Sequence, residues 1–273
     1  MDDNNDIVRS VRNYVTEAFK YDGWLQSYGF KHLQEQYNYA ESVVNFLFSP
    51  QEKPLSILEA DTGTGKTIGY LIPLLTYAAI TNKRIVISTY TIRLQNQILA
   101  KDYEVAKNFL RDMGLPSISI AQRIGRSHYV DSNRVQLYLN LLKKKSKLTK
   151  KHSDFLTWAK NQEYAGSGLL QDWLDVNNDF PSDIDISDVC LTPESSAEIN
   201  FGFINQILNA RHAQIVITSH ACVFENLRQR GALFSESNSQ PISTIIFDEA
   251  HNLPNAATNF GNKRLQLRQV VNI

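Results

Sequence analysis

A glycine-bearing loop between an apolar stretch and a long apolar helix constrains this chain more than any other feature. The pattern fits a phosphate-binding loop in which Ala replaces the first Gly. Backbone N–H groups of such a loop, together with the N-terminus of the next helix, cradle phosphate oxygens. We expect a strand at residues 55–60 and a helix at residues 66–80. The loop residues are Ala60, Asp61, Thr62, Gly63, Thr64, Gly65, Lys66 and Thr67.

Two side chains of the loop have predicted chemical roles. Lys66 would reach the β- and γ-phosphates of a nucleotide, and the Thr67 hydroxyl would bind Mg²⁺. Gly63 and Gly65 let the backbone curl around an anion without a Cβ in the way. The alternative is an accidental glycine-rich turn, and the strand and helix expected on either side argue against it.

Further apolar runs predict the fold class. Residues 84–89, 117–121, 213–218 and 243–247 are rich in β-branched side chains and lack polar alternation, which is typical of parallel strands buried on both faces. Helical patterns separate them, at residues 6–27, 33–48 and 92–113. Strands alternating with helices predict an α/β fold in which helices cover a parallel sheet.

Residues 127–199 break this rhythm and predict a mostly helical insertion. The patterns there favour helices at residues 135–142, 155–161 and 169–176. A basic run, residues 143–151, lies near Tyr138 and Trp158. It could follow a nucleic-acid backbone with the aromatic side chains stacking on bases, but a solvated face is the favoured alternative.

Composition sets outer limits on function. The chain has 273 residues, 42% of them hydrophobic, and its 28 basic and 28 acidic residues cancel. Zero net charge neither supports nor excludes nucleic-acid binding, which needs only a local basic face. The acidic start does not resemble a secretory signal, and no run approaches the ~20 apolar residues of a membrane helix. We expect a reduced cytoplasmic protein without a membrane partner, in which Cys190 and Cys222 are small apolar packing residues.

A second acidic motif follows the last apolar run. Asp248 and Glu249 come directly after Phe247, at the C-terminal end of a strand, which is where P-loop ATPases hold Mg²⁺. Asp248 would then be the metal-side carboxylate, and Glu249 would orient and deprotonate the attacking water. The alternative is a strand that ends in a solvated acidic turn.

The spelling Asp-Glu-Ala-His at residues 248–251 resembles superfamily 2 helicases, whose motor domains are RecA-like. The resemblance implies that His251 couples the ATP site to bound nucleic acid. Gln36, with Phe30 upstream, resembles the adenine-reading Gln motif, although an ordinary surface Gln is an equal alternative. Residues 88–97 resemble motif Ia, which grips the single-strand backbone. Thr91 and Arg93 would be its phosphate donors, although a capped helix start explains Thr91 equally well.

Within that superfamily the chain resembles the XPD/DinG-like group. Residues 125–129 and 210–221 are similar to the segments that enter and leave its iron–sulfur domain. Such a cluster needs four Cys thiolates, yet Val130 stands where the first ligand is expected and Cys190 is the insertion's only cysteine. No iron–sulfur cluster is therefore expected. This departure resembles the form associated with type IV CRISPR systems, and implies a CRISPR ribonucleoprotein complex as partner.

Taken with the resemblance, the sequence predicts a RecA-like domain made of residues 1–126 and 200–273, with the insertion at residues 127–199. The implied activity is an ATP- and Mg²⁺-dependent DNA helicase acting on single-stranded DNA or a forked duplex with 5′-to-3′ polarity. The chain ends about where the family's arch domain begins, so we expect weak turnover by this chain alone. A P-loop kinase should lack both helicase motifs. A nucleic-acid-binding module with a weak or regulatory ATP site remains the alternative.

Overall fold

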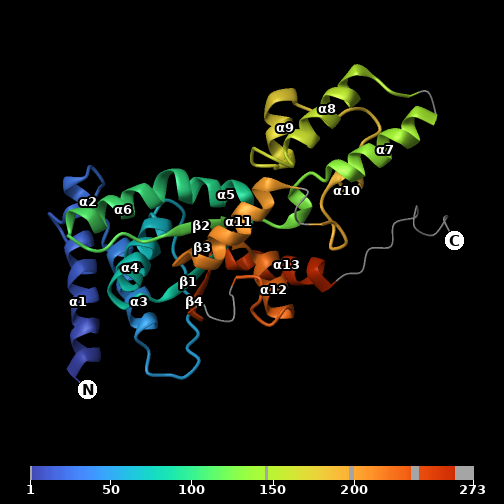
Figure 1. The fold of residues 1–273 in the computed structure, drawn as a ribbon. Helices are drawn as coiled ribbons and strands as arrows, with labels where there is room; N and C mark the ends of the chain where they lie inside the picture. Colours follow the sequence, from blue (N-terminus) through green and yellow to red (C-terminus); the bar gives the residue numbers. More distant parts are fainter. Residues whose placement is uncertain (1, 145–146, 197–199, 235–239, 262–273) are drawn as a thin grey trace. The chain divides into compact units, whose positions relative to one another are not determined.

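The computed structural model describes residues 2–144, 147–196, 200–234 and 240–261. Four strands form one sheet in the order β2-β3-β1-β4. Strand β1 pairs in parallel with β3 on one side and with β4 on the other. The predicted α/β class, with a parallel sheet covered by helices, is confirmed (Figure 1). The strands are β1 Arg84–Thr89, β2 Ile120–Arg123, β3 Ile215–Ser219 and β4 Ile242–Phe247.

The chain divides into two compact units. Unit 1 comprises Met1–Ile120, His212–His220 and Ser235–Ala256, and unit 2 comprises Ala121–Arg211, Ala221–Phe234 and Ala257–Ile273. The predicted insertion lies inside unit 2. Its bounds stay a prediction, because unit 2 also includes residues that follow β3. We expected the segment of residues 200–273 to include the start of an arch domain at its end, and residues 262–273 lie outside the described part of the chain.

Helix α4 is the central helix of unit 1. It begins after Gly65, whose φ of 73° lies in the left-handed region that glycine adopts without strain. Every residue from Ile68 to Ala78 is buried, and the helix packs against α1, α3 and α6. Its side chains fill a core shared with β1 and β3. The first helices of the chain are α1 Asp2–Phe19, α2 Trp24–Ser27, α3 Gln34–Leu47 and α4 Lys66–Thr81.

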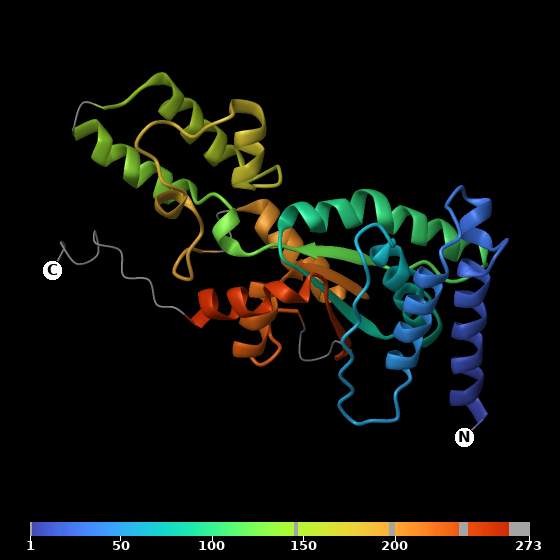
Figure 2. The same ribbon diagram turned by 180° about the vertical axis from the view of Figure 1, so that it is seen from behind.

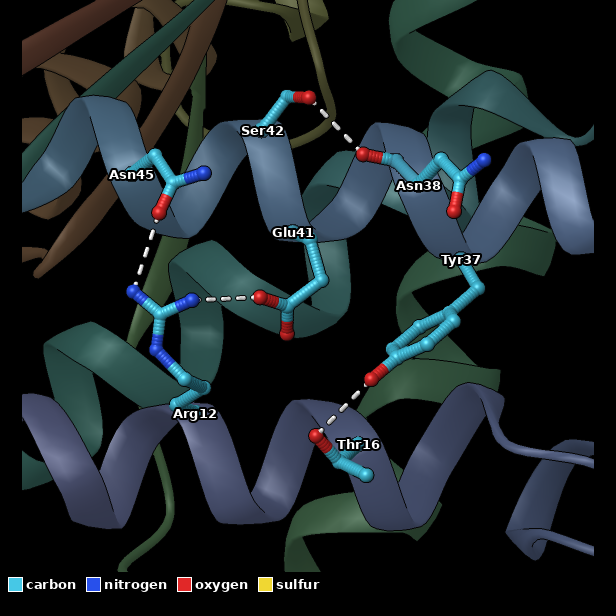
Figure 3. A network of polar contacts seen from close by, with 7 residues as sticks. All are labelled: Arg12, Thr16, Tyr37, Asn38, Glu41, Ser42 and Asn45. Carbon is cyan, nitrogen blue, oxygen red and sulfur yellow. Dashed lines mark hydrogen bonds and ion pairs between the residues drawn. The ribbon is translucent and has the colours of Figure 1, made fainter.

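Polar contacts join α1 to α3 beside this core (Figure 3). Arg12 donates to Glu41 at 2.6 Å and to Asn45 at 3.0 Å. The Thr16 and Tyr37 hydroxyls lie 3.3 Å apart. On its other face α1 buries apolar side chains in the core, as its amphipathic pattern requires.

The strand predicted at residues 55–60 is wrong. These residues form no strand, and Leu55 and Ile57 are 86% and 88% exposed. Figure 2 shows the segment as a long loop after α3. A strand needs a neighbour whose backbone groups pair with its own. The segment makes no such pairing with β4, whose side chains remain only partly buried at the edge of the sheet.

The helix predicted at residues 92–113 is present but contains a π-helical turn. The turn, Ile98–Asp102, lies between α5, Ile92–Gln97, and α6, Tyr103–Asp112. A π turn inserts an extra residue into a helix and shifts the face that follows it. Here it leaves the Asp102 side chain 9% exposed. The predicted strand at residues 117–121 begins later, with β2 at Ile120.

Unit 2 has its own apolar core. Phe155 is fully buried, stacks on Trp158 at 5.6 Å and meets Trp173 edge-on at 4.9 Å. Val130 and Cys190 belong to the same core and face each other in an isolated antiparallel bridge. The remaining helices are η2 Arg126–His128, α7 Ser132–Lys144, α8 Lys150–Asn161, α9 Leu170–Asn177, α10 Ile186–Val189, α11 Phe201–His212, α12 His220–Arg228, η4 Ala250–Asn252 and α13 Leu253–Gly261.

The contacts of the basic run favour a solvated face. Lys147 pairs with Asp183 at 3.5 Å, and Lys151 pairs with Asp179. Lys145 and Ser146 lie outside the described residues. Both Trp158 and Tyr138 pack against the core of unit 2, so their presence is explained without a bound base. No helix in the described ranges is long and apolar enough to span a bilayer.

Candidate nucleotide-binding site

The predicted phosphate-binding loop forms a tight turn at the start of α4. Gly63 and Gly65 have φ values of 88° and 73°, so both use the backbone freedom for which glycine was predicted. Thr64 closes the turn, because its hydroxyl donates to the Asp61 carbonyl at 2.8 Å. The Lys66 ammonium folds back onto the loop and donates to the Ala60 carbonyl at 2.8 Å. The lysine thus lies over the loop's concave backbone.

Gln36 contacts this loop from α3. Its side chain is 7% exposed, and its Nε2 donates to the Gly65 carbonyl at 2.9 Å. A Cβ at Gly65 would lie 2.2 Å from the same nitrogen, so a side chain cannot replace glycine there without moving Gln36. The surface-glutamine alternative is therefore wrong. Gln36 is a buried residue that fixes the end of the loop.

Asp248 lies at the end of β4 beside α4. The Tyr70 hydroxyl, one turn after Lys66, donates to Asp248 Oδ2 at 3.2 Å. Burial raises the pKa of the Asp248 carboxyl, Glu249 raises it further, and the Tyr70 hydroxyl and the Lys66 charge lower it. A buried carboxylate with a raised pKa is stabilised by a nearby cation. The loop helix and the acidic motif therefore meet, although 182 positions separate Lys66 from Asp248.

Glu249 is held in a strained backbone conformation. Its φ of 55° and ψ of 46° lie in the left-handed region, which non-glycine residues rarely adopt. Its backbone N–H donates to Asp248 Oδ1 at 3.1 Å, and its carbonyl accepts from the Asn252 N–H at 3.0 Å. Glu249 Oε2 lies 3.3 Å from His251 Nδ1. Strained residues held by surrounding contacts often occur at functional sites.

The residues predicted to hold Mg²⁺ offer the oxygen ligands that this ion prefers. Thr67 supplies a hydroxyl in the first turn of α4, and Asp248 supplies a buried carboxylate. Magnesium prefers such hard oxygen ligands and usually completes its shell with water and substrate phosphates. Across the described residues no group of three or more His, Cys, Asp or Glu side chains is arranged to hold a metal.

A cavity adjoins the start of the loop. Its volume is about 470 Å³, within the usual range for small-molecule sites. It lies between α3 and the residues that lead into the loop. Its walls offer carboxylate, amide and hydroxyl groups together with an aromatic ring. The lining residues are Glu35, Asn38, Tyr39, Ser42, Leu58, Glu59, Ala60 and Asp61.

The two predicted nucleic-acid contacts lie together at the start of α5. Thr91 caps this helix, because its hydroxyl accepts from the Leu94 N–H at 3.2 Å. The capping role predicted for Thr91 is confirmed. Its predicted contact with a nucleic-acid phosphate stays a prediction. Thr91 and Arg93 are both exposed.

Sequence reasoning missed residues that support the acidic motif. Tyr70 could have been found from its spacing, because residues four apart in a helix share a face with Lys66. Tyr39 gave no such signal; burial and the Asp248 charge raise its pKa to about 12. Asp102 also remained hidden, because it lies in a π turn that the sequence pattern did not predict. Burial and the Asp248 charge raise the pKa of Asp102, while Lys101 lowers it.

His220 is a buried histidine whose two ring nitrogens differ in their hydrogen bonding. It is 1% exposed, and its Nδ1 lies 2.7 Å from the Ser88 hydroxyl. Its Nε2 is buried and has no hydrogen-bond partner among the described residues. The expectation that both cysteines are packing residues is consistent with their burial.

Comparison with known proteins finds relatives that include named DNA helicases. No protein-family model matches the chain. The chain is 27% identical over 270 residues to "ATP-dependent DNA helicase YoaA" of Haemophilus influenzae, covering 96% of this chain and 39% of that protein. It is 28% identical over 219 residues to "3'-5' exonuclease DinG" of Bacillus subtilis, covering 77% of this chain and 21% of that protein. It is 26% identical over 215 residues to "ATP-dependent DNA helicase DinG" of Escherichia coli, covering 73% of this chain and 29% of that protein. The chain is thus similar to DinG- and YoaA-type helicases and spans well under half the length of each.

Proposed function

We propose that this chain is the ATP-binding motor region of a DNA helicase of the XPD/DinG-like group. It would couple ATP hydrolysis to movement along single-stranded DNA and to duplex unwinding. One observation carries the proposal: the Tyr70 hydroxyl on the loop helix donates to Asp248 at 3.2 Å, so the loop helix and the acidic motif lie side by side, as a shared nucleotide site requires. The similarity to proteins named ATP-dependent DNA helicases supports the choice of substrate.

Each site residue then has a role in hydrolysis. The loop backbone and Lys66 bind the phosphates, and Thr67 and Asp248 hold Mg²⁺. The ion, when bound, neutralises charge on the phosphate oxygens. Glu249 orients the attacking water and accepts its proton. The remaining residues of the phosphate cradle are Asp61, Thr62, Gly63, Thr64 and Gly65.

We propose that the nucleoside lies between α3 and the loop. The cavity there offers Asn38 and Ser42 as hydrogen-bonding groups and the Tyr39 ring as an apolar surface. Such a mixture suits a flat heterocycle with a few polar edges. Gln36 lies under the loop end and would link the base to the phosphate cradle.

The nucleic-acid side of the site is the segment that opens α5. Thr91 and Arg93 are exposed there, and they would bind backbone phosphates of a single strand or a forked duplex. His251 would couple DNA binding to Glu249, because its Nδ1 lies 3.3 Å from Glu249 Oε2. The direction of movement we propose is 5′ to 3′.

We further propose that residues 127–199 form an insertion without an iron–sulfur cluster. Such a cluster needs cysteine thiolates. Burial raises the pKa of the Cys190 thiol and so disfavours its thiolate, while Val130 and Cys190 lie in an apolar core. A CRISPR ribonucleoprotein complex is the proposed partner, and binding of the purified complex to the purified protein tests it.

The decisive test measures ATP hydrolysis with and without single-stranded DNA, for this chain and for any longer natural protein that contains it. We expect DNA to stimulate hydrolysis and Glu249→Gln to abolish it while ATP still binds. Motors of this kind take an arginine from a second domain or a partner, worth about 10³–10⁵ in rate in P-loop systems. Little turnover by the isolated chain with robust turnover by the longer protein is therefore the expected result. Absence of DNA stimulation in both would contradict the proposal.

The alternative is a nucleic-acid-binding module with a weak or regulatory ATP site. The exposed segment that opens α5 would serve either function, so the two are separated by Lys66→Ala. The motor requires this substitution to abolish unwinding of a tailed duplex. The module requires DNA binding and function in the cell to survive it. Duplexes with a 5′ or a 3′ tail also report the direction of movement.

A further inference from the structure

His220 occupies a junction of three strand ends in unit 1. It follows Ser219, the last residue of β3. Across the sheet, β1 is the neighbour of β3 and β4 is the neighbour of β1. The His220 Nδ1 lies 2.7 Å from Ser88 Oγ on β1. The Ser88 carbonyl accepts from the Asp248 N–H at 2.8 Å, so Ser88 connects the imidazole to the acidic motif.

The second nitrogen of His220 faces the backbone of the acidic motif. Burial lowers the pKa of the imidazole, and the backbone groups of Glu249 and Asp248 oppose that effect. The Nε2 atom is buried and makes no well-aligned hydrogen bond in the described part of the chain, although the backbone of Asp248 and Glu249 lies near enough to raise the pKa of the ring. A buried polar atom without a partner is costly. It becomes satisfied if the peptide between Asp248 and Glu249 moves a short distance toward it.

The imidazole ring also lies near the proposed DNA-binding segment. The ring centroids of His220 and Tyr90 are 6.3 Å apart, and those of His220 and Phe247 are 5.7 Å apart. Tyr90 is 44% exposed and directly precedes Thr91. A DNA strand on this segment would therefore press on a ring that contacts His220.

We propose that His220 is a positioning residue that transmits DNA binding at residues 90–93 to the proposed general base, Glu249. The imidazole lies near the backbone of a strained left-handed residue and near an exposed aromatic ring. The role rests on the proposed function, because it concerns stimulation of hydrolysis by DNA. It assigns His220 no contact with ATP.

The test compares two isosteric substitutions in the natural protein. In His220→Asn the amide can reach Ser88, as Nδ1 does, but cannot reach the acidic motif. In His220→Gln the amide reaches toward the position of Nε2. We expect His220→Asn to reduce the DNA-stimulated rate about five- to tenfold, at the low end of ordinary coupling between sites. Basal hydrolysis and ATP affinity should stay unchanged, and His220→Gln should recover part of the stimulation. His212→Asn, at an exposed histidine, is the matched control.

A double-mutant cycle separates transmission from a structural role. Tyr90→Ala, at an exposed ring, should also reduce stimulation, and its effect should be non-additive with that of His220→Asn. A merely structural histidine would lower the melting temperature without changing the ratio of stimulated to basal rate. Additive effects, or an unchanged ratio in folded His220→Asn, would overturn the inference. If His220→Asn does not fold, the Tyr90→Ala and His220→Gln cycle decides. A wild-type protein without DNA-stimulated hydrolysis would instead refute the proposed function.

Discussion

Two buried carboxylates in unit 1 show how residue environment prepares this site. Burial raises the pKa of both Asp248 and Asp102. Asp248 receives a hydrogen bond from Tyr70 and the field of Lys66. Asp102 has one carboxylate oxygen buried without a partner among the described residues. Asp248 thus has groups that stabilise its charge, whereas the burial of the Asp102 carboxylate lowers the free energy of unfolding.

Replacing Asp102 should therefore stabilise the protein at neutral and higher pH. The pKa of Asp102 is higher in the folded than in the unfolded state. Its effect on the free energy of unfolding is therefore most favourable below the unfolded pKa, where the carboxyl is neutral, and becomes unfavourable as pH rises through the folded pKa. We expect Asp102→Asn to gain about 1 kcal/mol at pH 8, or roughly 2–4 °C in melting temperature. The gain should shrink at the most acidic pH at which the wild type still folds. A lower melting temperature of the variant at pH 8 would be inconsistent with an unpaired charge.

Gln36 is predicted to affect nucleotide affinity through the loop backbone. Its hydrogen bond to the Gly65 carbonyl is buried, and losing one such bond costs about 1 kcal/mol. Gln36→Ala should therefore weaken ATP binding about fivefold, measured by titration with a fluorescent nucleotide. Gln34→Ala, an exposed position on the same helix, should leave affinity unchanged. Equal affinities for the two variants would remove Gln36 from the site.

At the scale of elements, α3 connects the stability of unit 1 to its site. One face packs on α1 (Figure 3), and another provides Gln36 and lines the cavity. The ion pair between Arg12 and Glu41 is partly solvated, with side chains 41% and 22% exposed. Val15 on α1 is fully buried. Burial of apolar side chains, rather than this pair, should hold α1 in place.

Two substitutions in α1 test that ranking. Partly exposed ion pairs contribute less than about 1 kcal/mol, so Arg12→Ala should have a small effect on the free energy of unfolding. Val15→Ala removes buried methyl groups and should cost about 2 kcal/mol. Denaturant unfolding of both variants measures the difference. A larger loss from Arg12→Ala than from Val15→Ala would reverse the ranking.

Element predictions succeeded where the sequence pattern alone determines the structure. β1 matches its predicted residues because a continuous β-branched run fits a strand buried on both faces. α4 was predicted because Gly65 precedes an apolar run of helix length. Residues 55–60 have a similar apolar pattern but form no strand. Whether such a segment forms a strand depends on a pairing strand that the tertiary fold places beside it, and a local apolar run does not specify that partner.

Site predictions followed the same division. The glycines, Lys66 and the Asp248–Glu249 pair are recognisable because their chemistry demands those residue types at fixed positions. The hydrogen bond of Gln36 to the loop and that of Tyr70 to Asp248 join residues far apart in the sequence. Asp102 depends on a π turn. Such contacts follow from packing, so a single sequence leaves them open.

At the scale of the whole molecule, the relatives are much longer than this chain, which covers between 21% and 39% of the proteins compared. The residues proposed to bind nucleotide all come from unit 1. On the proposed function, unit 1 contains the binding groups, while hydrolysis would also need an arginine from a second domain or a partner. ATP affinity is thus the property that this chain alone should possess.

The most direct measurement is the affinity of the wild-type chain and of Lys66→Ala for ATP in the presence and absence of Mg²⁺. We predict Mg²⁺-dependent binding by the wild type and at least about tenfold weaker binding by Lys66→Ala, since the substitution removes the charge that contacts the phosphates. Lys83→Ala, which removes the same charge at an exposed position just beyond α4, should bind as the wild type does. Equal affinity of Lys66→Ala and wild type, or no binding by either, would contradict the assignment of residues 60–67 and 248–249 as an ATP site.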